Sequence, residues 1–223
     1  MIKIEKTEVY GFESAIRGMR NPKNSWNKID SDWEFVEDPS IINPNDEVKF
    51  VLGENDADLM RRLCKGGPVH AKFRRMIAVW VDITAPLYWW KEFDTYKVGT
   101  TANSCSTMHK IHAKELTVDD FSIEHLNVGN YLIFERCIIS ALNDARNDFL
   151  QYADKADWWQ MIQLLPTSYN QKRTVMLNYE VLVGIYRDRK NHKLDEWHKL
   201  CEWIENLPYS WIITGKENEN GET

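Results

Sequence analysis

Residues 76 to 109 read Met-Ile-Ala-Val-Trp-Val-Asp-Ile-Thr-Ala-Pro-Leu-Tyr-Trp-Trp-Lys-Glu-Phe-Asp-Thr-Tyr-Lys-Val-Gly-Thr-Thr-Ala-Asn-Ser-Cys-Ser-Thr-Met-His. The first nine positions place apolar residues on both faces of an extended chain, which predicts a strand central in its sheet. Ala85-Pro86 ends that strand and begins a helix with the Trp89-Trp90 pair. A surface loop needs no such pair, and a core strand would not contain the hydroxyl-rich run 100–107. We therefore interpret this segment as the wall of a pocket.

Composition excludes several classes of protein. The net charge of -6 argues against a general nucleic-acid binder, because binding to the phosphate backbone needs a positive surface. No apolar run reaches the roughly 18 to 20 residues that span a bilayer. The charged start, Met1 to Lys6, lacks the apolar stretch of a signal peptide. We therefore expect a cytoplasmic protein with no membrane association.

The length of the chain limits the number of domains, and the cysteine spacing indicates the state of the thiols. The 223 residues are enough for one well-filled core, and we expect a single domain over 1–214. Residues 215–223 have no apolar side chain to bury, which predicts a disordered tail. The four scattered cysteines are typical of reduced thiols. His109 and His112 have helical spacing but no third ligand, so we expect no metal site.

The remaining periodicities predict the other elements. We expect a first strand over 2–10, a helix over 12–19, and a turn-rich segment over 20–50 with short strands. Asn55 is the expected N-cap of a helix over 56–65. Further helices are expected over 128–149, 157–165, 171–186 and 193–205. This order describes an α/β or α+β domain, with a mixed sheet flanked by helices.

The first candidate binding segment begins at Thr95-Tyr96-Lys97, where the helix after Pro86 is expected to end. The run 100–107 can offer hydroxyls and backbone N–H groups to a phosphate or a base, and Lys97 would supply the positive charge. An equally open interpretation is that these hydroxyls only cap helices and turns.

The second candidate binding segment follows Leu165-Pro166 and carries Lys172, Arg173, Asn178 and Arg189. Asn178 and Arg189 are eleven positions apart, about three helical turns, so both side chains can face one ligand. Guanidinium groups suit bidentate phosphate binding. The alternative is a solvated basic helix face, which is the commoner outcome for an isolated charge run.

The order of the two segments resembles that of the flavin-dependent thymidylate synthases, over roughly residues 1 to 206. In that family an apolar strand runs into Ala-Pro, a helix ends in Arg-His-Arg before a Ser-rich turn, and Leu-Pro much later precedes a ligand-binding Asn and Arg. Ala85-Pro86 and Leu165-Pro166 match the two dipeptides. Cys105 falls at the second Ser of the turn.

The resemblance implies roles for particular residues and a quaternary structure. It implies a homotetramer with active sites between subunits. By this match Arg189 would bind dUMP. The implied nucleotide-binding residues are Arg189, Ser106, Thr107, Lys172 and Arg173, and the implied FAD-binding residues are Lys97, Tyr96, Thr95, Asn103, Asn178 and His192.

The implied activity is that of a transferase and flavoprotein. Such an enzyme would transfer a one-carbon unit from methylenetetrahydrofolate to dUMP with FAD and NADPH. The chain has Thr95-Tyr96-Lys97 in place of Arg-His-Arg, and Glu180 where an Arg usually follows the Asn. An alternative is therefore a non-catalytic or repurposed relative that binds a nucleotide or a protein partner at the same place. Another is an interaction protein that uses its aromatic surface.

No catalytic residue is defined by the sequence. Cys105 is a weak candidate, because a thiolate beside Lys97 and helix-terminal N–H groups would be a nucleophile. A buried, inert thiol is the commoner state of a free cysteine.

Overall fold

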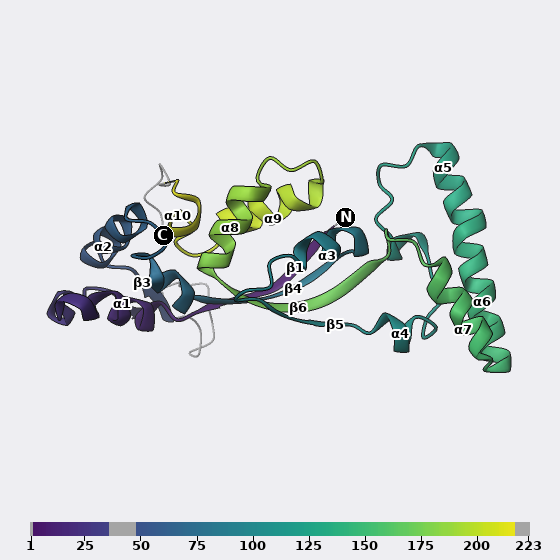
Figure 1. Cartoon of the computed structure of the whole chain (residues 1–223), viewed down its shortest axis with the longest axis horizontal. Coiled ribbons are helices and arrows are strands. Elements are labelled where there is room, and N and C mark those ends of the chain that lie inside the picture. Colours follow the sequence, from purple (N-terminus) through teal and green to yellow (C-terminus); the bar gives the residue numbers. More distant parts are fainter. Residues whose placement is uncertain (1, 36–47, 217–223) are drawn as a thin grey trace.

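Two antiparallel sheets organise the computed structural model of the protein, which describes residues 2–35 and 48–216 (Figure 1). The larger sheet has the strand order β1-β4-β6-β5, and the smaller one pairs β2 with β3. The strands are β1 (Lys3–Tyr10), β2 (Asp32–Phe35), β3 (Val48–Val51), β4 (Ala78–Pro86), β5 (Thr101–Ser104) and β6 (Asn170–Asn178).

Helices gather at both ends of the larger sheet and on one side of it (Figure 1). The α-helices are α1 (Phe12–Arg20), α2 (Glu54–Lys65), α3 (Leu87–Phe93), α4 (Thr107–Lys110), α5 (Val128–Ile133), α6 (Ser140–Tyr152), α7 (Lys155–Leu164), α8 (Tyr179–Arg189), α9 (Asp195–Glu205) and α10 (Trp211–Thr214). Shorter turns are η1 (Asn21–Lys23), η2 (Trp26–Lys28), η3 (Lys72–Met76) and η4 (Val118–Asp120), and η5 (Phe134–Ile139) is a π-helix.

The central strand β4 has one buried and one open face. Val79, Val81 and Ile83 are at most 1% exposed and face the helices, whereas Trp80 on the other face is 38% exposed. Strand alternation sends successive side chains to opposite faces. The central position expected for this strand is confirmed, because β4 pairs with both β1 and β6. Apolar residues on both faces of this segment would suit a strand that is covered on both sides, but the face with Trp80 is open.

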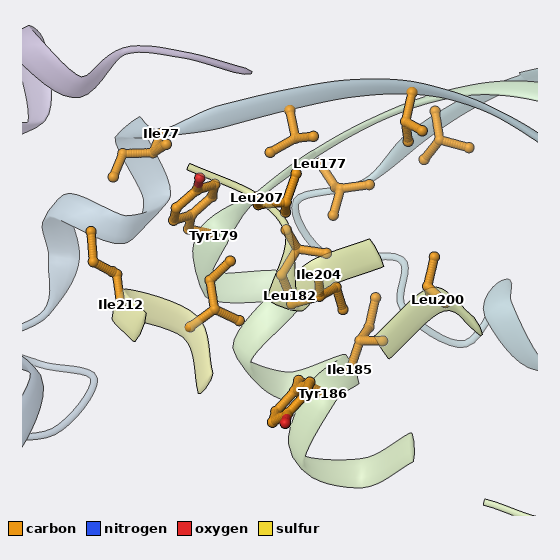
Figure 2. Close-up of a cluster of buried hydrophobic side chains, with 14 of the residues drawn as sticks. Ile77, Leu177, Tyr179, Leu182, Ile185, Tyr186, Leu200, Ile204, Leu207 and Ile212 are labelled. Atoms are coloured by element: carbon orange, nitrogen blue, oxygen red, sulfur yellow. The ribbon is translucent and has the colours of Figure 1, made fainter. Parts of the chain in front are cut away.

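Helix α8 ties the sheet to the C-terminal helices. Leu182 and Ile185 point from α8 toward Leu200 and Ile204 of α9, and all four side chains are buried (Figure 2). Tyr179, at the start of α8, is also buried, and its hydroxyl donates to the backbone oxygen of Pro208 at 2.5 Å. This packing fixes both ends of α8 relative to the sheet.

A helical arm extends from the other end of the sheet (Figure 1). Helix α5, the π-turn η5 and α6 follow one another without a break, as the expected helix over 128–149 requires. Helix α7 packs back against α6. The arm has apolar clusters of its own, centred on Leu142 and on Met161.

A buried ion pair joins α1 to α2. The Asp56 carboxylate is fully buried and accepts from Nε of Arg20 at 2.6 Å. The side chain of Asp30 accepts from the backbone N–H groups of Asn55 and Asp56 at 2.8 and 3.1 Å. Asn55 is therefore not the N-cap that we expected. The helix starts at Glu54 because Asp30, far away in the sequence, satisfies its free N–H groups.

The largest correction concerns the expected helix over 171–186. Its first half is strand β6, and α8 begins only at Tyr179. The apolar residues behind the prediction, Leu182 and Ile185 among them, all lie in α8. Val175 and Leu177 alternate with more exposed neighbours, and pairing with β4 and β5 on either side makes this segment a strand. Local periodicity gave no sign of that pairing.

The α/β or α+β prediction is confirmed, with two smaller differences. Pairings among the described strands are antiparallel, where we expected a mixed sheet. After the helical arm the chain returns to the larger sheet, where β6 pairs antiparallel with β4. In the tail, Lys216 pairs with Glu205 at 2.7 Å. The rest of the expected disordered tail lies outside the described residues, and the single domain over 1–214 stays a prediction.

Candidate functional site

An aromatic cluster under the sheet forms the base of the candidate site. Trp89 and Trp90 of α3 are 0% and 1% exposed, and their rings lie 4.9 Å apart. Trp197 of α9 lies 4.8 Å from Trp89. The Trp90 indole N–H donates to the backbone oxygen of Gln171 at 2.9 Å, which fastens α3 to β6. The tryptophan pair is therefore core, and its faces are not open to a base or a flavin.

Arg189 lies at one end of this cluster. Its Nη1 donates to Oε2 of Glu92 at 2.9 Å, and its Nε donates to the hydroxyl of Tyr96 at 2.9 Å. The guanidinium lies over the Trp197 ring at 4.6 Å. The same Glu92 oxygen accepts from the Trp197 indole N–H at 3.0 Å and lies 3.3 Å from Nε2 of His192. Arg189 is thus positioned by one carboxylate and two aromatic rings.

Arg173 lies at the other end of the cluster, on β6. Its Nη1 donates to Asp94 at 2.8 Å, and its Nε donates to the side chain of Gln171 at 3.0 Å. Its guanidinium lies over the Trp90 ring at 4.2 Å. In the described part of the chain, Nη2 of Arg173 and Nη2 of Arg189 have no hydrogen-bond partner. Each arginine therefore keeps its Nη2 amino group, with two N–H donors, for a ligand.

Lys172 is separated from the two arginines by the sheet. Neighbouring residues of a strand point to opposite faces, and Lys172 pairs with Asp82 on the open face at 2.9 Å. Hydrogen bonds from Thr174 and Lys172 hold the pKa of Asp82 below its usual range. The Asp82 partner also raises the pKa of Lys172. The predicted grouping of Lys172 with Arg173 and Arg189 is wrong, because it assumed a helix here.

The polar run after α3 forms an exposed edge. Residues 101–104, with Asn103 among them, are exposed in β5, and the pocket wall expected of this run stays a prediction. The Ser106 hydroxyl accepts from the His109 N–H at 3.2 Å and caps α4. Thr107 accepts from Gln171 at 3.2 Å. Cys105 is exposed, which is contrary to the buried state that is commoner for free cysteines.

The predicted flavin-binding residues are largely engaged within the chain. The Thr95 hydroxyl donates to the Glu92 backbone oxygen at 2.7 Å, and Asn178 caps α8 by accepting from the Val181 N–H at 3.1 Å. His192 accepts from the Leu194 N–H at 3.2 Å through Nδ1. Tyr96 is held by Arg189, as described above.

The exposed Lys97 supplies the one positive charge of the segment 95–97. The diphosphate of FAD carries two negative charges, which proteins neutralise with several N–H donors or cations. Lys97 is the one cation that the segment 95–97 offers against the two charges of this diphosphate, so the described residues fit the group poorly.

Glu180 stands where an Arg usually follows the Asn in the family, and its contacts explain the presence of a carboxylate there. Its carboxylate lies 3.8 Å from Nη1 of Arg74, and the two side chains are 21% and 11% exposed. Burial raises the pKa of the neighbouring Cys64 thiol. Glu180 is therefore part of an ion pair between α8 and η3, away from Arg189.

The sequence reasoning missed Glu92 as a contributor to the site, and it missed the contacts that Asp94 and Trp197 make there. Glu92 and Trp197 meet Arg189 only through the packing of α3, α8 and α9, and Asp94 meets Arg173 across the sheet edge. No local spacing signals such contacts.

Comparison with known proteins defines the fold. The chain has the fold of the flavin-dependent thymidylate synthases. It is similar to thymidylate synthase X (ThyX) from Helicobacter pylori, solved with FAD and dUMP, with a TM-score of 0.64 and 15% identity. That match covers 96% of this chain and 97% of the other.

A second similar structure is the UMP/dUMP methylase PolB from Streptomyces cacaoi, bound with 5-Br dUMP. The TM-score is 0.55 at 13% identity, over 92% of this chain and 88% of the other. No family model matches the sequence, and no curated protein does either.

No described helix combines the length and the apolar character that a membrane span requires. Across residues 2–35 and 48–216, no three His, Cys, Asp or Glu side chains gather as metal ligands would.

Proposed function

We propose that this protein binds a pyrimidine nucleoside monophosphate such as dUMP, with Arg189 and Arg173 as its phosphate-binding residues. The observation that carries the proposal is the pair of guanidiniums at the two ends of one aromatic cluster, each with a free Nη2. Arginine suits phosphate because its planar fork donates two parallel hydrogen bonds. The fold shared with the dUMP-bound structure supports the same ligand class.

In this proposal some residues hold Arg189 in place and others add charge for the ligand. Glu92 and Trp197 hold the Arg189 side chain in place before any ligand arrives, so little side-chain entropy is lost on binding. The exposed Lys97 adds a positive charge near Tyr96. The Ser106 hydroxyl accepts from the His109 N–H and the Thr107 hydroxyl accepts from Gln171, so each keeps its own O–H to donate to the ligand.

A second candidate is the flavin-dependent transfer of a one-carbon unit to dUMP. It is favoured by the match to a structure that holds FAD and dUMP over almost the whole chain. FAD would supply the redox chemistry of that reaction, with NADPH and methylenetetrahydrofolate as the other reactants. The single positive charge of the segment 95–97 favours the first candidate, a nucleotide-binding relative without the flavin.

One experiment separates the two candidates. The visible spectrum of the freshly purified protein is recorded, and its thermal stability is then followed during titrations with dUMP and with FAD. A colourless protein that dUMP stabilises and FAD does not supports the first candidate. A bound flavin, or stabilisation by FAD, supports the enzyme. Stabilisation by neither ligand contradicts both.

A homotetramer in the cytoplasm, expected by resemblance, is part of the proposal. The open face of the larger sheet supports association, because Tyr10 and Trp80 are 56% and 38% exposed there. Light scattering coupled to size-exclusion chromatography measures the mass directly. A monomer of 26.3 kDa would contradict the tetramer.

A further inference from the structure

A cavity lies at the opposite end of the sheet from the arm. It has a volume of about 790 Å³ and lies between the start of α1, strands β2 and β3, α2 and the segment before α10. Ligand pockets for small molecules typically measure about 300–1,000 Å³. We call it the N-terminal cavity. None of the residues at Arg189, Arg173 or the aromatic cluster around Trp89 lines it.

Aromatic side chains form much of its wall. Phe12 and Phe50 are stacked with their centroids 5.6 Å apart, and Tyr209 meets Phe12 edge-on at 5.4 Å. Trp33 meets Phe50 edge-on at 5.4 Å and keeps 46% of its surface exposed. Aromatic walls of this kind favour a planar ring, because ring faces and edges attract one another at these distances.

The backbone around the cavity is held firmly. The Tyr209 hydroxyl accepts from the Leu52 N–H at 2.8 Å and donates to the Phe50 backbone oxygen at 2.9 Å. Tyr209 itself has a φ of 51°, which is a strained value for a residue with a side chain. Gly11 also lines the cavity with a φ of 103°, and an added Cβ there would lie 2.2 Å from the Met76 oxygen. The wall is thus preformed.

The charged groups of the cavity cancel once Lys216 is counted, which does not line the cavity but pairs with its Glu205. Arg61 pairs with Glu54 at 2.7 Å and lies over the Trp211 ring at 5.2 Å. Glu205 pairs with Lys216 at 2.7 Å. Glu13 and Lys49 add one charge of each sign. A cavity without net charge offers a phosphate no advantage, whereas the Arg61-Glu54 pair presents a donor and an acceptor side by side.

We propose that the N-terminal cavity binds an uncharged, planar heteroaromatic molecule of about the size of a purine nucleoside. The aromatic residues would stack on or surround its ring, and Arg61 with Glu54 would bind the donors and acceptors on its edge. This ligand is separate from the pyrimidine nucleotide proposed for Arg189.

Adenosine is a suitable probe, measured by titration calorimetry on the full chain beside AMP. We expect adenosine to bind and AMP to bind more weakly, because the phosphate gains nothing from a neutral cavity. Trp33→Ala and Arg61→Gln should each weaken adenosine binding by about tenfold, in keeping with the usual value of one base stacked on one aromatic ring. Trp159→Ala is the matched control, since Trp159 is 42% exposed on α7 and lines no part of the cavity.

The two sites are distinguished by crossed measurements. Arg189→Ala should leave adenosine binding unchanged, and Trp33→Ala should leave dUMP binding unchanged. The proposal is overturned by absence of adenosine binding, by AMP binding as tightly as adenosine, or by a loss in Trp159→Ala equal to that in Trp33→Ala. A loss of dUMP binding in Trp33→Ala would overturn the independence of the cavity.

Discussion

Arg189 and Glu92 are 97 positions apart in the sequence, yet Nη1 of Arg189 donates to Oε2 of Glu92 at 2.9 Å. The two side chains are 18% and 35% exposed, so the pair is partly shielded from water. A nucleotide phosphate would have to share this guanidinium with the carboxylate. Under the proposed function, Glu92 therefore both positions Arg189 and competes with the ligand.

Replacing Arg189 tests its assignment as a phosphate ligand. Arg189→Ala should weaken dUMP binding at least about tenfold, since a charge-assisted hydrogen bond contributes about 1.5–3 kcal/mol. Arg187→Ala is the control, because Arg187 lies on the same helix, is exposed and, within the described residues, pairs with its neighbour Asp188. Titration calorimetry gives both affinities. Equal affinities for the two variants would remove Arg189 from the site.

Neutralising Glu92 should have the opposite effect on affinity. Glu92→Gln keeps an oxygen that can accept from Trp197 and removes the charge that competes for Arg189. We expect dUMP to bind more tightly, with a small loss of thermal stability in the absence of ligand. Weaker binding in Glu92→Gln would mean that the carboxylate only supports the geometry of Arg189.

The buried pair of Arg20 and Asp56 should matter most for stability. Asp56→Ala leaves the Arg20 guanidinium buried without its partner, and breaking such pairs costs about 3–5 kcal/mol. Urea denaturation monitored by circular dichroism measures the free energy of unfolding. Asp58→Ala is the control: its exposed pair with Arg62 on the same helix should contribute less than about 1 kcal/mol. Similar losses in the two variants would contradict the role of Asp56.

The four thiols should differ in reactivity. Burial raises the pKa of the Cys201 thiol to about 11, and it also raises the pKa of the partly buried Cys64. Cys105 and Cys137 are exposed. Because the thiolate is the reacting species, alkylation at pH 8 followed by mass spectrometry should label Cys105 and Cys137 first. Early labelling of Cys201 would contradict the packing of α9.

The loss of thermal stability at acidic pH should depend in part on the Glu205 carboxyl. Hydrogen bonds from Lys216 and Tyr186 lower the pKa of its carboxyl below the ordinary 4.5. Such a group stabilises the fold above its ordinary pKa, and this stabilisation is lost as pH falls through the lowered value. Thermal stability of the wild type should therefore fall more steeply below about pH 4.5 than that of Glu205→Gln. Parallel curves would show that the pair contributes nothing.

Much of the fold was predictable where the signal is local. The strand that leads into Ala85-Pro86 and the helix after it follow from strong alternation and from a proline at a helix start. The arm follows from its long helical period. These segments have one conformation that fits both their own sequence and their neighbours.

The rest of the site depended on pairing across the sheet. Treating β6 as helix placed Lys172 beside Arg173, whereas the strand sends the two side chains to opposite faces. Arg189 was named from the sequence as a candidate ligand, but its partners Glu92 and Trp197 come from elements far apart in sequence. Tertiary contacts of this kind produce no periodic pattern in the sequence, so the sequence alone does not predict them.

The most direct test of the account compares dUMP with deoxyuridine in calorimetric titrations of the wild-type protein. The two ligands differ only in the phosphate that Arg189 and Arg173 are proposed to bind. We predict that dUMP binds and that deoxyuridine binds at least about tenfold more weakly, because it lacks the charge-assisted hydrogen bonds. Equal affinities, or no detectable binding of dUMP, would contradict the proposed function.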